Sequence, residues 1–209
     1  MNLPTVPYPP EASVVEFSFP EGSLATAPHE QAWIIHKARQ TSGGIVEIGT
    51  FRGVTGAAMA RHFPSRNVFL VDYWHPSWMH GPSAQQSEFL PVHEIGASAR
   101  SLPNVSLSLV RSELFDFAPT DAGLIFIDGG HSFMQVAADT LAVMRYHAKF
   151  PKNRTIVWHD YYPNGDHQDW AGVNAFLEAL ATKVRVEQVE GTILAFSDWT
   201  AETKFDSQP

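Results

Sequence analysis

The apolar residues of this chain form short continuous runs, separated by stretches with helical spacing. Runs rich in Val, Ile, Leu and Phe, with glycine or polar residues at their ends, are typical of strands buried in a sheet. The segments of this kind are 44–49, 67–74, 106–112, 122–130, 154–162 and 184–197. The last of them contains Glu190-Gly191, a turn signal that divides it into two strands.

Between these runs, apolar residues recur at the three- and four-residue spacing of helices. The predicted helices are 29–40, 55–63, 133–150 and 172–182. Strands that alternate with helices form a mostly parallel sheet with helices on both faces. The closing strand pair, joined by a short turn, indicates an antiparallel hairpin. We therefore expect an α/β fold, a Rossmann-like three-layer α/β/α sandwich.

Prolines separate a candidate arm from a candidate domain. Prolines at positions 4, 7, 9, 10, 20 and 28 argue against a regular helix near the N-terminus. We predict a proline-rich arm over 1–28, the main domain over 29–200 and a C-terminal tail over 201–209. The arm could cover the active site, exchange between the subunits of a homo-oligomer, or be a loosely packed tail.

The composition restricts the partners and the compartment. A formal net charge of -8, without a lysine-arginine cluster, argues against nucleic acid and anionic membranes as partners. The absence of cysteine excludes disulfides, thiolate metal sites and a cysteine nucleophile. The first residues lack the basic and apolar regions of a signal peptide, and no segment reaches the length of a membrane span. We therefore expect a cytoplasmic protein.

Acidic residues and a histidine stand at the carboxyl ends of the predicted strands. Glu47, Asp72 and Asp128 each end an apolar run, and the pair His159-Asp160 ends another. In open α/β sheets, ligands bind outside the carboxyl ends of the strands. We therefore expect these side chains to line one binding crevice.

The segment IVEIGTFRGVTG (45–56) places a glycine turn next to Glu47. Its glycines lack the G-x-G-x-x-G spacing of a dinucleotide-binding turn, and no Lys-Ser or Lys-Thr pair follows as in a P-loop. Glu47 would repel a pyrophosphate and attract a cationic group. Asp72, at the end of the second strand, is placed to bind the hydroxyls of a ribose. A nucleoside with a cationic tail and no phosphate describes S-adenosylmethionine.

Several segments together resemble the class I S-adenosylmethionine-dependent methyltransferases. These segments are VEIGTFRGVTG, LVDYW, LIFIDGGHSFMQVAADT and IVWHDYYP. The chain looks most similar to a small-molecule O-methyltransferase-like branch, in which an IDG-x-H strand end is followed by HDY. The likeness covers roughly residues 30–198 and implies a seven-stranded sheet whose last strand is antiparallel.

The resemblance also implies the cofactor contacts. Glu47, Gly49 and Gly53 would contact the methionine end of S-adenosylmethionine, and Asp72 would bind the ribose. Ser112 and Glu113 would lie near the adenine. The complete set of expected cofactor-binding residues is Glu47, Gly49, Thr50, Phe51, Gly53, Asp72, Tyr73, Ser112 and Asp128.

Methyl transfer to a hydroxyl needs a deprotonated acceptor, and therefore a general base, a metal ion or both. His131 is the candidate base, because it follows Asp128 closely and histidine titrates near neutral pH. Asp128, His159 and Asp160 are candidate ligands of a divalent cation, and the imidazole favours manganese or another transition ion over magnesium. Without a metal, His159 would act with His131 as a proton-handling pair that Asp160 orients. The candidate catalytic residues are thus His131, Asp128 and His159.

Two aromatic segments, 73–96 and 161–170, are candidates for the wall that meets a small-molecule acceptor. Their rings could stack on the acceptor or simply bury the loops. The rings concerned are Trp74, Trp78, Tyr161, Tyr162 and Trp170. Two other functions stay open on the same fold: a metal-dependent hydrolase or hydroxylase-like protein, and a non-catalytic nucleoside-binding protein.

Overall fold

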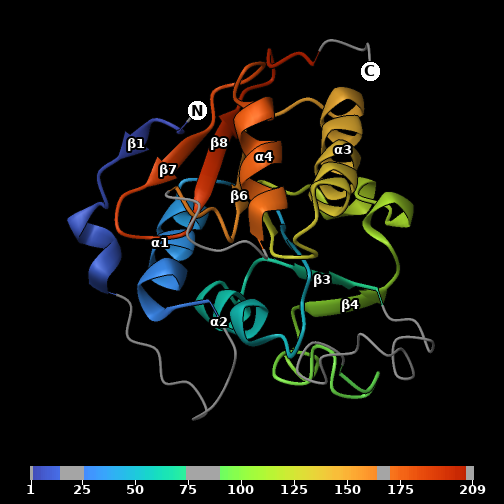
Figure 1. Cartoon of the computed structure of the whole chain (residues 1–209). Coiled ribbons are helices and arrows are strands. Elements are labelled where there is room, and N and C mark those ends of the chain that lie inside the picture. The colour runs from blue at the N-terminus through green and yellow to red at the C-terminus, as the bar shows by residue number, and fades with distance from the viewer. Residues whose placement is uncertain (1, 15–25, 74–89, 164–169, 206–209) are drawn as a thin grey trace, which may run out of the picture.

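In the computed structural model, the described residues are 2–14, 26–73, 90–163 and 170–205, and they form one mixed sheet with helices on both faces (Figure 1). The strands lie side by side in the order β1-β7-β8-β6-β5-β2-β3-β4. They are β1 (Thr5–Val6), β2 (Ile45–Ile48), β3 (Val68–Asp72), β4 (Val105–Leu109), β5 (Leu124–Ile127), β6 (Arg154–Trp158), β7 (Glu187–Val189) and β8 (Ala195–Trp199).

All neighbouring strands in this sheet run parallel, except that β8 is antiparallel to both β6 and β7. The predicted mostly parallel sheet with an antiparallel last strand is therefore confirmed. The predicted hairpin is also present, and β8 returns between β6 and β7.

Four α-helices and three short 3-10 helices connect the described strands. The α-helices are α1 (Pro28–Arg39), α2 (Val54–His62), α3 (Phe133–Lys149) and α4 (Ala171–Leu180), and the 3-10 helices are η1 (Pro10–Val14), η3 (Ser112–Leu114) and η4 (Ala118–Thr120). The start of α3 is fixed by a capping box, in which Ser132 accepts from the backbone N–H of Gln135. No described helix is long and apolar enough to cross a membrane.

The apolar strands are buried on both faces, and this produces two cores. In β5, Ile125 and Ile127 pack with residues of α3 and α4, whereas Leu124 and Phe126 pack with residues of α1 and α2. Side chains alternate between the faces of a strand, so a strand covered on both faces needs a continuous apolar run. Figure 1 shows α3 and α4 together on one side of the sheet. The three-layer sandwich is thus a direct consequence of these runs.

The proline-rich N-terminal segment contributes one strand beyond the expected seven. Thr5 and Val6 of β1 pair in parallel with Gln188 and Val189 of β7, at the edge of the sheet. The backbone N–H of Gln188 donates to the carbonyl of Pro4. A two-residue strand between prolines has too little apolar pattern to be recognised from the sequence.

Candidate active site

The polar residues at the carboxyl ends of β2, β3, β5 and β6 lie at the same end of the sheet. These strands are adjacent in the order β6-β5-β2-β3 and run parallel, so their carboxyl ends point the same way. Glu47 belongs to β2 and Asp72 ends β3, while Asp128 and His159 directly follow β5 and β6. The fold therefore brings together the strand-end residues identified in the sequence.

The glycine turn after β2 is attached to the end of β3 by Asp72. The Oδ2 atom of Asp72 accepts hydrogen bonds from the backbone N–H groups of Thr50 and Phe51, at 2.9 and 2.8 Å. The turn bends sharply, since Phe51 and Gly53 have φ angles of 48° and 75°. Thr50 and Phe51 thus contribute backbone amides, and one oxygen of Asp72 is committed to holding the turn.

Two glycines of this turn are required because backbone segments approach each other closely. Gly49 has a φ angle of 84°, and a Cβ atom at this position would overlap the carbonyl group of Asp128. A Cβ atom on Gly53 would lie 2.8 Å from the Cα atom of Gly96. Both glycines therefore have a packing role, and Gly49 is the point where the ends of β2 and β5 touch.

Glu47 is a buried carboxyl group without a balancing cation among the residues that the structure describes. Its Oε2 atom has no hydrogen-bond partner within that part of the chain, and a Cβ atom on Gly56 would lie only 2.6 Å from it. Burial, followed by the negative charges of Asp128 and Asp72, raises the pKa of Glu47 well above its ordinary value. Three carboxyl groups thus converge at the ends of β2, β3 and β5.

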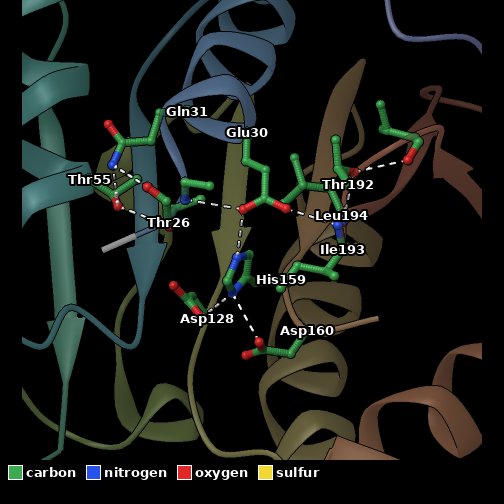
Figure 2. Close-up of polar contacts among 12 residues, drawn as sticks. Thr26, Glu30, Gln31, Thr55, Asp128, His159, Asp160, Thr192, Ile193 and Leu194 are labelled. Carbon is green, nitrogen blue, oxygen red and sulfur yellow. Dashed lines mark hydrogen bonds and ion pairs between the residues drawn. The ribbon is translucent and has the colours of Figure 1, made fainter. Parts of the chain in front are cut away.

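His159 lies at the centre of a second group of carboxyl groups (Figure 2). Its Nε2 atom is 3.3 Å from Oε2 of Glu30, and its Nδ1 atom is 3.1 Å from Oδ1 of Asp128 and 3.3 Å from Oδ1 of Asp160. Ionised carboxylates only accept hydrogen bonds, so both ring nitrogens carry protons in this arrangement. Burial lowers the pKa of His159, but the charge of Asp128 and the hydrogen bonds to the carboxylates outweigh burial and raise this pKa well above its ordinary value.

Asp160 connects His159 to His131. Its Oδ2 atom is 3.0 Å from Nε2 of His131, while its Oδ1 atom faces His159. Asp160 has a φ angle of 63°, a left-handed backbone conformation that is uncommon for residues other than glycine. Burial would raise the pKa of Asp160, but the hydrogen bonds from His131 and His159 lower it far below its ordinary value.

The contact with Asp160 also determines which nitrogen of His131 is basic. Because Nε2 of His131 donates to Asp160, the neutral imidazole has its lone pair on Nδ1. The side chain of His131 is 37% exposed, so this ring is accessible at the edge of the sheet. A partly exposed histidine oriented by a buried aspartate is an arrangement that is compatible with a general base.

Ser112 and Tyr73 lie on the β3–β4 side of the site. Ser112 is buried, and its hydroxyl donates to Oδ1 of Asp139 on α3. Burial raises the pKa of Asp139 to about 6, although the hydrogen bond from Ser112 opposes this shift. Tyr73 is exposed, and its ring centre is 6.0 Å from the guanidinium carbon of Arg111. This side of the site therefore contains a half-buried carboxyl group, Asp139, whose pKa is raised to about 6.

A family model described as a methyltransferase domain matches residues 46–161, which is more than half of the chain. The chain belongs to this methyltransferase-domain family. The matched segment runs from β2 past Asp160 and therefore includes the glycine turn and the strand ends. A comparison of the sequence with curated proteins gives no match.

The methyltransferase also resembles solved structures. A calicheamicin methyltransferase is 14% identical, with a TM-score of 0.59, over 81% of this chain and 77% of that chain. A methyltransferase of Podospora anserina with bound SAH is 16% identical, with a TM-score of 0.58, over 87% and 82% of the two chains. An O-methyltransferase of Streptomyces achromogenes involved in tomaymycin synthesis, in complex with SAM, is 19% identical, with a TM-score of 0.53, over 86% and 83%. These likenesses show a common fold.

The expected aromatic wall is only partly described in the structure of this methyltransferase. Trp74 and Trp78, like all of 74–89 and 164–169, lie outside the described residues. Tyr161 is a core residue, whose hydroxyl accepts from the backbone N–H of Leu3. The rings of Tyr162 and Trp170 are 5.3 Å apart, and that of Trp170 is 5.7 Å from His131. Tyr162 and Trp170 therefore place an aromatic surface beside His131.

Two acidic residues of the site, Glu30 and Asp139, were not identified from the sequence. Both are on helices, where the pattern showed only which face is buried, and their partners are distant in the sequence. Glu30 contacts His159, 129 residues away, and Asp139 contacts Ser112, 27 residues away. No local spacing signals such pairs, although a carboxyl group on the buried face of a helix does indicate a polar partner.

The geometry of Asp128, His159 and Asp160 is compatible with a metal ion. One potential ligand atom from each residue lies within 4.8 Å of the others. Two carboxylates and an imidazole suit manganese or another transition ion better than magnesium, which prefers oxygen ligands. An ion at this position would have to replace the proton on Nδ1 of His159.

Proposed function

We propose that this methyltransferase transfers a methyl group from S-adenosylmethionine to a hydroxyl group of a small molecule. The observation that carries the proposal is the convergence of Glu47, Asp72 and Asp128 at the glycine turn. No lysine or arginine forms an ion pair with any of them in the described parts of the chain. A ligand with a positive charge and sugar hydroxyls matches such a site, because it balances the charge and donates hydrogen bonds to the carboxyl groups.

The orphan Oε2 atom of Glu47 supports this ligand further. A buried polar atom without a partner costs free energy unless a ligand donates to it. The ammonium group at the methionine end of the cofactor is such a donor. The second oxygen of Asp72 would bind ribose hydroxyls, because Oδ2 already holds the turn. Two structurally similar methyltransferases have SAM or SAH bound, which adds support at the level of the fold.

In the proposed reaction, the cofactor supplies the electrophilic methyl group, and the protein prepares the acceptor. Nδ1 of His131 would take the proton of the acceptor hydroxyl, and Asp160 would stabilise the resulting imidazolium through Nε2. Tyr162 and Trp170 would contact the acceptor beside His131. Residues Glu47 and Asp72 would hold the cofactor, so binding and proton transfer use different strand ends.

A divalent cation is a second component that we propose at this site, favoured by the mutual approach of Asp128, His159 and Asp160. These residues would hold the ion, and the ion would lower the pKa of an acceptor hydroxyl. Calorimetric titration with Mn²⁺ and Mg²⁺ tests this component directly. Binding of Mn²⁺ that is lost in Asp128→Asn would support it, and absence of binding of either ion would remove it.

The experiment that tests the cofactor is calorimetric titration of the purified protein with S-adenosylhomocysteine, with and without a chelator. NAD serves as a control ligand of the same general fold class. We expect micromolar or tighter binding of S-adenosylhomocysteine and no binding of NAD. If S-adenosylhomocysteine does not bind in either condition, the methyl-transfer function is wrong.

A further inference from the structure

Glu30 lies in the first turn of α1 and has only 3% of its surface exposed. It connects three segments that are far apart in the sequence. Its Oε1 atom accepts from the backbone N–H of Ile193 at 2.8 Å, and its Oε2 atom accepts from the backbone N–H of Ala27 at 3.1 Å. The same Oε2 atom faces Nε2 of His159 at 3.3 Å (Figure 2).

The two backbone contacts hold the carboxylate of Glu30 in place. They come from the start of α1 and from the turn between β7 and β8, so the carboxylate cannot move without breaking a buried hydrogen bond. Burial raises the pKa of Glu30, but the hydrogen bond with His159, followed by those from the backbone of Ile193 and Ala27, outweighs burial and holds this pKa below its ordinary value. Glu30 is therefore a fixed, ionised acceptor in the wall of the site.

A fixed acceptor on Nε2 determines where Nδ1 of His159 points. The ring of His159 also packs edge-on against Phe126, with ring centres 6.1 Å apart. With Nε2 held by Glu30, Nδ1 is directed at Asp128 and Asp160. Asp160 is then held through Oδ1, and its Oδ2 atom is presented to His131 at 3.0 Å.

We propose that Glu30 is a positioning residue that orients His131 through His159 and Asp160. The proposal rests on the role of His131 proposed above. It deepens that role by extending the site to α1, which packs on the face of the sheet opposite α3 and α4. Glu30 contacts neither the proposed cofactor residues Glu47 and Asp72 nor His131 itself among the described contacts. Its effect on the base is therefore transmitted by side chains.

The alternative is that Glu30 serves only the fold, through Ala27 and Ile193. The neighbouring Gln31 offers a matched control, because it is equally buried and also holds the start of α1. Its Nε2 atom donates to the carbonyl of Thr26 and to Oγ1 of Thr55, and it has no described contact with His159. Loss of Gln31 would therefore loosen the same helix without disturbing the histidines.

The test uses ligand-free protein with ¹⁵N-labelled histidine, and it compares wild type, Glu30→Gln and Gln31→Ala by NMR. In Glu30→Gln, we expect the ring nitrogen signals of both His159 and His131 to shift. In Gln31→Ala, we expect a lower melting temperature with both signals unchanged. The proposal is overturned if the His131 signal stays in place in Glu30→Gln, or if it shifts as much in Gln31→Ala.

A second variant tests the link from His159 through Asp160 to His131, in case Glu30→Gln does not fold. His159→Gln leaves Glu30 bound to the amides of Ala27 and Ile193. We expect the His131 ring signals to shift in this variant too, and unchanged signals would contradict the proposal. Titration of the same wild-type sample with S-adenosylhomocysteine tests the proposed function separately. Absence of binding would reject the cofactor. A shift of the His131 signal in Glu30→Gln would still support the positioning role of Glu30.

Discussion

The ends of β2 and β3 differ from the ends of β5 and β6 in how their charges are balanced. Glu47 and Asp72 have no cationic partner in the described structure, and burial raises the pKa of each. Asp128 and Asp160, by contrast, share the imidazole of His159, and Asp160 also holds His131. The first pair therefore has no charge partner among the described residues, whereas the second group has one in His159.

This difference supports the proposal that cofactor binding and proton transfer use different strand ends. An uncompensated buried carboxyl group costs stability in the free protein, and a cationic ligand removes that cost when it binds. Asp128 and Asp160 are already paired with His159, so they hold a fixed geometry in which protons can be exchanged. We therefore expect substitutions at β2 and β3 to change affinity and stability, and substitutions at β5 and β6 to change rate.

The largest effect should come from His131→Ala. Removal of a general base lowers the rate of the chemical step by about 10²–10⁴-fold. Steady-state kinetics with an acceptor found by screening hydroxylated small molecules would measure this loss. S-adenosylhomocysteine affinity should stay within about twofold of wild type, because His131 is absent from the β2–β3 side. His36→Ala is the control that should keep full activity, because the described side-chain contact of His36 is with Gln40 at the end of the same helix. Equal activity of the two variants would remove His131 from the mechanism.

Asp72→Asn should weaken the cofactor on the other side of the comparison. Loss of a charge-assisted hydrogen bond costs about 1.5–3 kcal/mol, which corresponds to a roughly 10- to 150-fold weaker dissociation constant. Calorimetric titration with S-adenosylhomocysteine measures the change. Asp121→Asn is a suitable control, because Asp121 is exposed and pairs with Lys152. Similar affinities for the two variants would show that Asp72 acts only on the glycine turn.

Gly49→Ala should disturb the contact between the two groups of strand ends. The substitution combines a φ angle of 84° with overlap on the carbonyl of Asp128, and we expect a loss of at least about 2 kcal/mol in the free energy of unfolding. Gly191→Ala separates the two causes, because Gly191 has a φ angle of 73° but open space around its Cα. Urea denaturation should show a loss of roughly 1 kcal/mol for that control. Equal losses would mean that the contact with Asp128 contributes nothing.

Glu47→Gln should give the smallest effect. The ligand-free protein should become more stable, whereas the cofactor should bind more weakly. The folded-state pKa of Glu47 is raised above 4.5, so its contribution to stability is fully present below that pH and is lost as the pH rises through the folded-state value. The amide has no such cost, and we expect the ligand-free variant to gain about 0.5–2 kcal/mol at neutral pH. Denaturant unfolding at several pH values would show a gain that grows as the pH increases. A gain independent of pH would contradict the raised pKa.

The sequence was sufficient for the three layers and the mostly parallel sheet, although not for β1, because the evidence for these layers is local. The few consecutive apolar residues of β5 predict a strand that is buried on both faces. Such a strand needs helices on both sides of the sheet. The same locality identified Asp128 and His159, since strand ends are visible in the sequence and parallel strands end at one edge. Glu30 was not found, because its role depends on residues in two other segments. The packing roles of Gly49 and Gly53 also required the structure, since they depend on Asp128 and Gly96.

The short strand β1 covers β7 at one edge of the sheet. An open strand edge presents unpaired N–H and C=O groups on which another chain can add a strand. Here the carbonyl groups of Pro4 and Val6 accept from the N–H groups of Gln188 and Glu190, so the edge at β7 is occupied by the same molecule. Pro4 and Pro7 on either side of β1 lack N–H groups and cannot extend the ladder further. Pro4 and Pro7 thus leave β1 with fewer N–H groups that a strand from another molecule could use.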